Sequence, residues 1–75
     1  MKKIVNGLLY DTDTSELIYH DEMNERRWYK TKNGNYFVLY SNGEIGTKTE
    51  DAVKDYLGKN HVDKYIDLFG EPREA

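Results

Sequence analysis

The sequence predicts a small α+β domain, in which an antiparallel β-sheet built from two hairpins precedes two short C-terminal helices. Three Asn-Gly pairs lie within the first 46 residues, and Asn-Gly tolerates the positive φ that tight hairpin turns require. From Thr47 onward, the apolar residues recur instead at the spacing of amphipathic helices. We therefore expect one domain over residues 1–75, mainly β over 1–46, a helical pair over 47–70 and a frayed tail over 71–75.

The strands are predicted in order from the positions of the turns. Residues 3–5 and 8–10 flank Asn6-Gly7 as a short hairpin, and the polar run 11–15 forms a turn that leads into a strand over 17–20. An aromatic hairpin follows over 25–40, centred on Asn33-Gly34. The third pair, Asn42-Gly43, marks one more turn and a further short strand.

The helices are predicted from caps and from apolar stripes. Thr47 to Glu50 matches a capping box, so a helix should follow to Leu57 and end at Gly58. Asn60 is placed to cap a second helix. Its stripe falls at i, i+3, i+4 and i+7, and Gly70 with Pro72 ends it. The stripe consists of Val62, Tyr65, Ile66 and Phe69.

The composition indicates a folded domain with an aromatic-rich core. Only 37% of the residues are hydrophobic, but 13% are aromatic and seven are tyrosine. Each aromatic ring buries about 150–250 Å². The chain has no cysteine and two histidines, so we expect no cofactor and no metal site. No long apolar run opens the chain, so we expect neither a secretory signal nor a membrane span, and a cytoplasmic location.

The register of the aromatic hairpin decides which of its faces is buried. A two-residue Asn33-Gly34 turn places Trp28 on the same face as Phe37 and Leu39, and leaves the tyrosines on the other. A three-residue Lys32-Asn33-Gly34 loop slips the pairing by one, and Trp28 then joins Tyr36 and Val38. We prefer the first, because it gathers the largest apolar groups in the core.

The aromatic hairpin is also the basic part of an acidic chain. Residues 25–48 carry a net charge of +3, whereas residues 1–24 and 49–75 each carry −3. Tyr, Trp and Arg are enriched in interface hot spots, so we expect this hairpin to bind a protein partner. The alternative is nucleic-acid binding, with basic side chains on phosphates and rings stacked on bases. The predicted partner-binding residues are Arg27, Tyr29, Lys32, Tyr36 and Tyr40.

Two acidic motifs have a structural explanation. Asp11, Asp13 and Glu22 match positions of a calcium-binding loop, but Glu16 stands where that loop needs glycine, so we interpret the motif as a turn. His20 stands beside two acids, as a general base could, but successive strand residues point to opposite faces and no nucleophile accompanies it. We predict that the chain is not an enzyme.

Three stretches of the chain carry a resemblance to a known family. They are Lys2-Lys3-Ile4-Val5-Asn6-Gly7 with Leu9-Tyr10-Asp11-Thr12, Thr14 and Glu16-Leu17-Ile18, then Tyr29-Lys30-Thr31-Lys32-Asn33-Gly34-Asn35-Tyr36-Phe37, and finally Tyr65-Ile66-Asp67-Leu68-Phe69-Gly70-Glu71. Together they resemble a family of small uncharacterised proteins from phages and integrated mobile elements of Gram-positive bacteria. The chain departs from that family between Tyr40 and Glu50. The resemblance implies an accessory protein that binds a host protein, such as an anti-CRISPR-like inhibitor of a defence nuclease.

Overall fold

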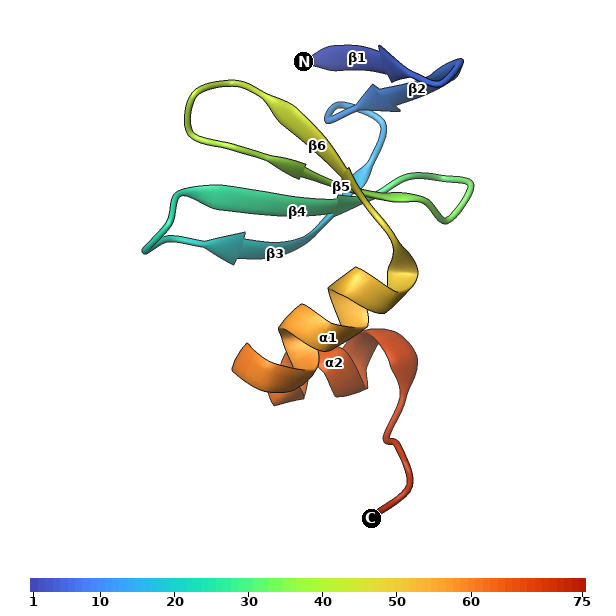
Figure 1. Cartoon of the computed structure of the whole chain (residues 1–75), viewed down its shortest axis with the longest axis vertical. Helices are drawn as coiled ribbons and strands as arrows, with labels where there is room; N and C mark the ends of the chain where they lie inside the picture. The colour runs from blue at the N-terminus through green and yellow to red at the C-terminus, as the bar shows by residue number, and fades with distance from the viewer.

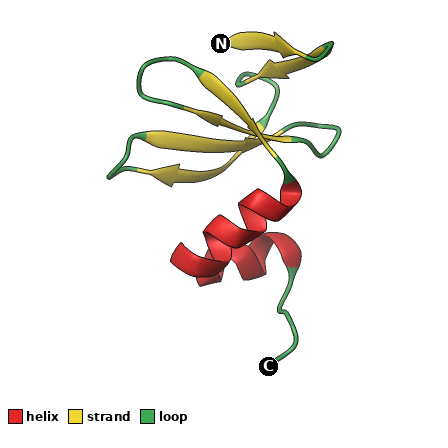
Figure 2. Cartoon of the chain, viewed as in Figure 1, coloured by secondary structure: helices red, strands yellow, loops and turns green.

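The computed structural model describes all 75 residues and confirms the α+β class. A two-stranded hairpin precedes a four-stranded antiparallel sheet, and two helices follow (Figure 1). The helices lie together on one side of the sheet, and the N-terminal hairpin lies at the opposite end of the molecule (Figure 2). The strands are β1 (Lys2–Val5), β2 (Leu8–Asp11), β3 (Glu16–Asp21), β4 (Arg26–Lys30), β5 (Tyr36–Leu39) and β6 (Ile45–Lys48), and the helices are α1 (Glu50–Asn60) and α2 (Val62–Phe69).

The β1–β2 hairpin turns over two residues, as expected. Val5 pairs with Leu8, and the intervening Asn6 and Gly7 have φ values of 52° and 77°. Both central residues of this tight turn need positive φ, which asparagine and glycine adopt at little cost.

The other two Asn-Gly pairs close three-residue loops. In the β4–β5 hairpin, the N–H of Thr31 donates to Asn35 O at 2.8 Å and the N–H of Gly34 donates to Thr31 O at 3.0 Å. Only the glycine has positive φ there, at 84°. Trp28 therefore pairs with Val38, and the preferred two-residue register is wrong. The dipeptide serves both kinds of loop, so its presence alone does not decide the register.

The first helix begins later and ends later than the sequence suggested. Thr49 is the N-cap, and its hydroxyl accepts a hydrogen bond from the N–H of Ala52 at 3.1 Å, whereas Thr47 belongs to β6. Gly58 lies inside α1, which continues to Asn60. Asn60, expected to cap the second helix, is instead the last residue of α1, and His61 stands at the N-cap of α2 without a side-chain hydrogen bond. Gly70 ends α2 with a φ of 85°. The β portion consequently runs to Lys48, two residues beyond the expected boundary.

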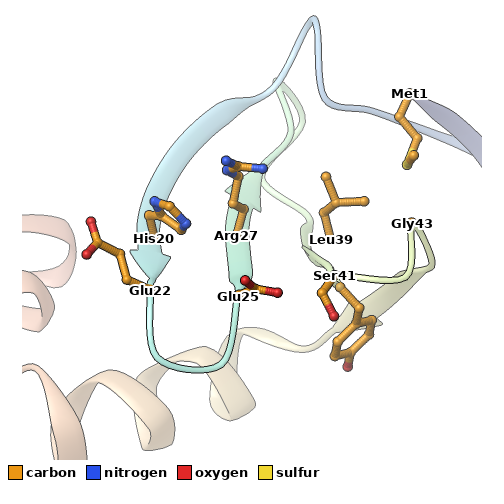
Figure 3. Close-up of a pocket in the computed structure, with 9 residues that line it drawn as sticks. Met1, His20, Glu22, Glu25, Arg27, Leu39, Ser41 and Gly43 are labelled. Carbon is orange, nitrogen blue, oxygen red and sulfur yellow. The ribbon is translucent and has the colours of Figure 1, made fainter.

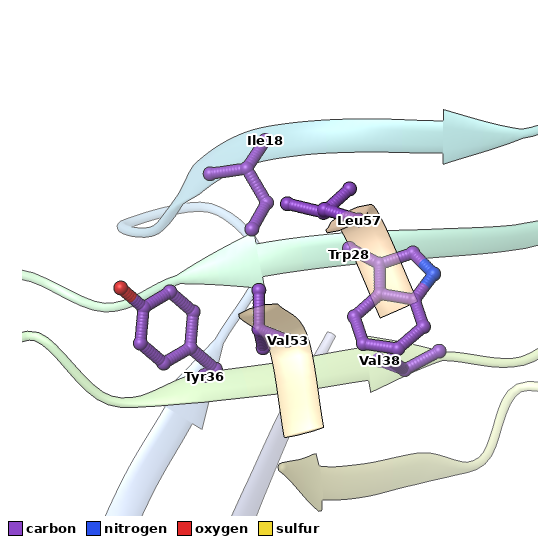
Figure 4. Close-up of a cluster of buried hydrophobic side chains, with 6 residues drawn as sticks. All are labelled: Ile18, Trp28, Tyr36, Val38, Val53 and Leu57. Carbon is purple, nitrogen blue, oxygen red and sulfur yellow. The ribbon is translucent and has the colours of Figure 1, made fainter. Parts of the chain in front are cut away.

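The sheet is covered on one face by the helices, and we call this face the helix face. There Val53 and Leu57 of α1 pack, fully buried, against Trp28 and Val38 of the sheet (Figure 4). Ile18 and Tyr36 complete this core. A β-bulge in β3 contributes to it, because the register shift between Leu17 and Tyr19 brings both Ile18 and Tyr19 to the helix face.

Candidate partner-binding surface

The opposite face of the sheet, which we call the outer face, is only partly covered. Alternation along the strands brings Phe37 and Tyr29 to this face. Tyr10 of β2 packs edge-on against Phe37, with 5.6 Å between the ring centroids. With Ile45 of β6, these rings form a second small core under the N-terminal hairpin. The hairpin therefore covers the outer face around Phe37 and Ile45 and leaves open the other half, which is formed by β3, β4 and Leu39 at the end of β5.

The open half contains a hollow of about 520 Å³ (Figure 3). His20, Arg27 and Leu39 stand opposite one another on β3, β4 and β5, so their side chains form a row across its floor. Met1 closes the end nearest the N-terminal hairpin. The remaining lining residues form the rim and are Glu22, Glu25, Tyr40, Ser41 and Gly43.

Of the predicted binding residues, Arg27 lies on the floor of the hollow. Its side chain is exposed and lies in the hollow between His20 and Leu39 (Figure 3). No carboxylate forms an ion pair with it, since the chain's two ion pairs are Glu50–Lys54 and Asp55–Lys59 within α1. An unpaired guanidinium beside an apolar side chain can bind a carboxylate or a carbonyl and cover apolar surface at once.

Tyr29 and Lys32 lie on the outer side but not in the hollow. Tyr29 stacks on Phe37, with 5.0 Å between the centroids and an interplanar angle of 9°, and it is half-buried. Lys32 is exposed in the β4–β5 loop, where it lines a separate groove with Leu8 and Leu9 of the N-terminal hairpin.

Tyr36 and Tyr40 were expected on the same exposed face as Arg27, and this prediction is wrong. Tyr36 is 4% exposed and belongs to the helix-face core. Tyr40 contributes to the rim of the hollow, but its ring packs against the helix-face core, with the guanidinium of Arg26 5.4 Å from the ring centroid. Its ring lies over Gly46, where a Cβ atom would approach Cε2 of Tyr40 to 2.9 Å. The register of the three-residue loop turns both tyrosines toward the helices.

The same alternation divides the basic residues of the hairpin between the two faces. Arg26 and Lys30 lie on the helix face with Tyr40 and Tyr36, whose rings they approach to 5.4 and 5.9 Å. Arg27 lies on the outer face, where Glu22 and Glu25 share the hollow with it, and Lys32 lines a separate groove on that side. The basic patch inferred from the sequence is therefore not continuous in the structure.

Several residues of the hollow were not predicted from the sequence. Leu39 was assigned to the core, and it packs against the second core, but it also lines the hollow beside Arg27. His20, which was not predicted to bind, is exposed and lines the same hollow. Met1 comes from a segment far from them in the sequence. The correct hairpin register would have identified Leu39, since it pairs directly with Arg27. No sequence signal indicates the contribution of Met1, because it depends on how the N-terminal hairpin docks.

A second polar cluster joins α1 to the sheet. The hydroxyl of Tyr56 donates to Asp21 Oδ2 at 3.0 Å and lies 3.3 Å from Nε2 of His61. Burial and the hydrogen bond to Asp21 raise the pKa of Tyr56 to about 12. The amide of Asn24 lowers the pKa of Asp21 by donating to its carboxylate at 2.9 Å, and Tyr56 adds to the effect.

This second cluster ties secondary-structure elements together. Tyr56 also stacks on Trp28, with 4.4 Å between the ring centroids, and the Tyr19 ring lies 4.0 Å from the His61 ring at an interplanar angle of 32°. The hydroxyl of Tyr56 donates a hydrogen bond to the carboxylate of Asp21, a residue that is only 8% exposed, so Tyr56 is a poor acid at neutral pH. The arrangement explains how the α1–α2 junction is held against β3.

The acidic turn after β2 has an internal hydrogen-bonding role. Asp11 is 6% exposed, and its Oδ1 accepts a hydrogen bond from the N–H of Asp13 at 2.9 Å, which is an Asx-turn. No group of three or more His, Asp or Glu side chains is positioned to hold a metal ion.

Comparisons with known proteins do not assign the chain to a family. No family model, curated protein or solved structure matches it. Neither helix is long and apolar enough to span a membrane.

Proposed function

We propose that this protein is a non-catalytic binding module that recognises a protein partner through the open half of its outer face. The observation that carries the proposal is the row His20, Arg27 and Leu39, which combines an unpaired guanidinium, an imidazole and an apolar floor in one hollow. Arginine next to apolar surface is a frequent energetic centre of protein interfaces, because it packs and hydrogen-bonds at the same time.

The charge distribution supports a protein partner over a nucleic acid. A polyanion would gain from one exposed arginine but would meet Glu22 and Glu25 at the same hollow. The other cations of the hairpin do not line the hollow, because Arg26 and Lys30 lie on the other face of the sheet and Lys32 lines a separate groove. Nucleic-acid binding by the hairpin is therefore the less supported alternative.

The class of partner is an extension of this proposal. The resemblance to proteins of phages and mobile elements implies a host protein, and an inhibitor of a defence nuclease of the anti-CRISPR kind is the activity it suggests. The acidic rim of the hollow is compatible with such a partner, because nucleic-acid-handling proteins carry basic surfaces.

The test is capture of a partner from host lysate, with and without nuclease treatment, by the wild type and by two arginine variants. We expect Arg27→Ala to weaken capture at least about tenfold, the effect of losing a hot-spot arginine. Arg26→Ala is the matched control, because it removes the neighbouring arginine from the opposite face. We expect it to leave capture unchanged.

Two results would contradict the proposal. Loss of the captured species on nuclease treatment, with steep weakening as salt rises, would indicate nucleic-acid binding. Equal effects of the two arginine variants, with both folded by circular dichroism, would show that the outer face is not the binding surface.

A further inference from the structure

We propose that β3 is the docking edge for an extended strand of the partner, and that this strand carries a carboxylate opposite Lys64. The inference rests on the proposed protein-binding function and specifies how the partner binds. Adding a strand to an exposed sheet edge is a recurring mode of peptide recognition, in which main-chain hydrogen bonds supply affinity and side-chain pockets supply specificity.

The first observation is that the outward edge of β3 is unpaired. The sheet order is β3-β4-β5-β6, so β3 has a neighbour on one side only. Outside the ladder with β4, no backbone group of residues 16–20 makes a hydrogen bond within the chain. The β6 edge differs, because Nζ of Lys3 donates to the carbonyl of Ile45 at 3.3 Å.

The pairing pattern identifies which backbone groups point outward. Thr31 directs its N–H toward β5, to Asn35 O, and backbone direction alternates along a strand, so Tyr29 and Arg27 also face β5. Their opposite residues in β3 are Leu17 and His20. In an antiparallel ladder two opposite residues either exchange hydrogen bonds or both turn away, so Leu17 and His20 direct their N–H and C=O groups outward.

The outward edge is continuous with the proposed binding surface. His20 lines both the hollow and a shallow trough of about 270 Å³ that follows β3. Leu17, which is 47% exposed, lies in the same trough. A strand paired with these two residues would extend the sheet and place its own outer-face side chains beside the floor of the hollow.

The charge at the trough indicates the chemistry of the added strand. Lys64 of α2 is the one Lys, Arg, Asp or Glu that lines it, and Lys64 forms no ion pair. Lys64 also lines the adjoining hollow on α2, where Asp63 and Asp67 accompany it, whereas neither aspartate lines the trough beside β3. A carboxylate on the added strand would therefore be attracted by Lys64 beside β3 and repelled by Asp63 and Asp67 farther along α2. This limits the carboxylate to the position opposite Lys64.

The bulge restricts the length of the added strand. β3 offers only Leu17 and His20 as outward hydrogen-bonding residues, separated by the bulged pair Ile18 and Tyr19. The pairing is consequently short, and the side chains on the outer face must supply the remaining affinity.

The direct test uses two blocked pentapeptides as probes, acetyl-Glu-Val-Glu-Val-Glu-amide and acetyl-Lys-Val-Lys-Val-Lys-amide. We expect the glutamate peptide to shift the amide NMR resonances of Leu17 and His20 saturably, and the lysine peptide to bind at least about threefold more weakly. Lys64→Glu should reverse this preference. The proposal is overturned if neither peptide shifts these two amides, if the shifts map to another edge, or if Lys64→Glu leaves the preference unchanged.

A backbone variant separates strand pairing from side-chain contact. His20→Pro removes an outward N–H without removing a ladder hydrogen bond, a position where an edge strand tolerates proline. His20→Ala is the matched control, because it keeps the N–H and loses the same imidazole. We expect the proline variant to bind the glutamate peptide at least about tenfold more weakly than the alanine variant. Equal binding by the two would contradict the pairing, and Leu17→Pro against Leu17→Ala repeats the comparison at the second position.

The same variants separate this inference from the proposed function. A captured partner that is lost with Arg27→Ala but binds equally to His20→Pro and His20→Ala would overturn strand addition and leave the outer-face site standing. Capture that is insensitive to Arg27→Ala but lost with His20→Pro would overturn the outer-face site and leave strand addition standing.

Discussion

At the scale of single residues, Tyr56 and Asp21 form the contact with the clearest electrostatic consequence. The hydroxyl of Tyr56 reaches across from α1 to a carboxylate that Asn24 already holds at the end of β3. Their hydrogen bond favours the neutral phenol and the ionised carboxylate, so the pKa of Tyr56 rises while that of Asp21 falls. Each shift predicts how stability depends on pH.

The raised pKa of Tyr56 predicts an alkaline loss of stability. Its folded value is about 12, against about 10 for a free tyrosine. The stabilisation that Tyr56 contributes is therefore complete below about pH 10 and is lost as the pH rises toward 12, because Tyr56 ionises first in the unfolded chain. Tyr56→Phe should weaken this alkaline dependence and remove a phenolate step near pH 12 from the ultraviolet titration. An unchanged titration would contradict the assignment.

The lowered pKa of Asp21 predicts an effect at the acid end. A carboxyl whose pKa is depressed by folding stabilises the protein above its unfolded pKa of about 4. That contribution disappears as the pH falls through the lower folded value. Asp21→Asn should therefore flatten the dependence of the unfolding free energy on pH below about 4, measured by urea denaturation. Asp13→Asn is the control, since Asp13 is exposed and lies outside this cluster.

At the scale of elements, the cap of α1 shows how tertiary structure selects between equivalent local signals. Thr47 and Thr49 both precede the helix, and the sequence pattern favoured Thr47. In the structure Thr47 pairs with Phe37 as part of β6, so its backbone is extended and cannot start the helix. Thr49 is the next hydroxyl available, and it caps the helix.

This assignment predicts different effects for two threonine substitutions. Thr49→Ala removes the side-chain cap and should destabilise the fold by about 1 kcal/mol. Thr47→Ala replaces an exposed strand residue and should cost at most about 0.5 kcal/mol. Urea denaturation followed by the fluorescence of Trp28 measures both. A larger loss for Thr47→Ala would place the helix start where the sequence pattern had it.

At the scale of the whole molecule, the sheet is covered from both sides by elements from opposite ends of the chain. The C-terminal helices cover the helix face, and the N-terminal hairpin covers part of the outer face. An isolated two-stranded hairpin is marginally stable in water, so the docking of the N-terminal hairpin through Tyr10 matters for both the hairpin and the sheet. What the hairpin leaves uncovered is the surface to which we assign binding.

The docking of the hairpin predicts unequal effects for two neighbouring residues of β2. Tyr10 is 7% exposed and packs on Phe37, so Tyr10→Ala should destabilise the fold by about 3 kcal/mol. Leu9 is 57% exposed on the other side of the hairpin, and Leu9→Ala should cost less than about 1 kcal/mol. Equal costs in denaturant titrations would show that the hairpin does not dock through Tyr10.

The sequence by itself determined the α+β class and the positions of the three Asn-Gly turns, because these depend on interactions between residues close in the chain. Of the stripe expected on α2, Tyr65 and Phe69 pack against the core, whereas Val62 is 56% exposed. The sequence also singled out Arg27. Only the tertiary structure decided the register at Asn33-Gly34, since that dipeptide suits loops of two and of three residues. This one-residue difference buries Tyr36 and leaves Leu39 beside Arg27. The sheet is covered on both faces, so neither register leaves a wholly exposed face that hydrophobicity alone could have identified.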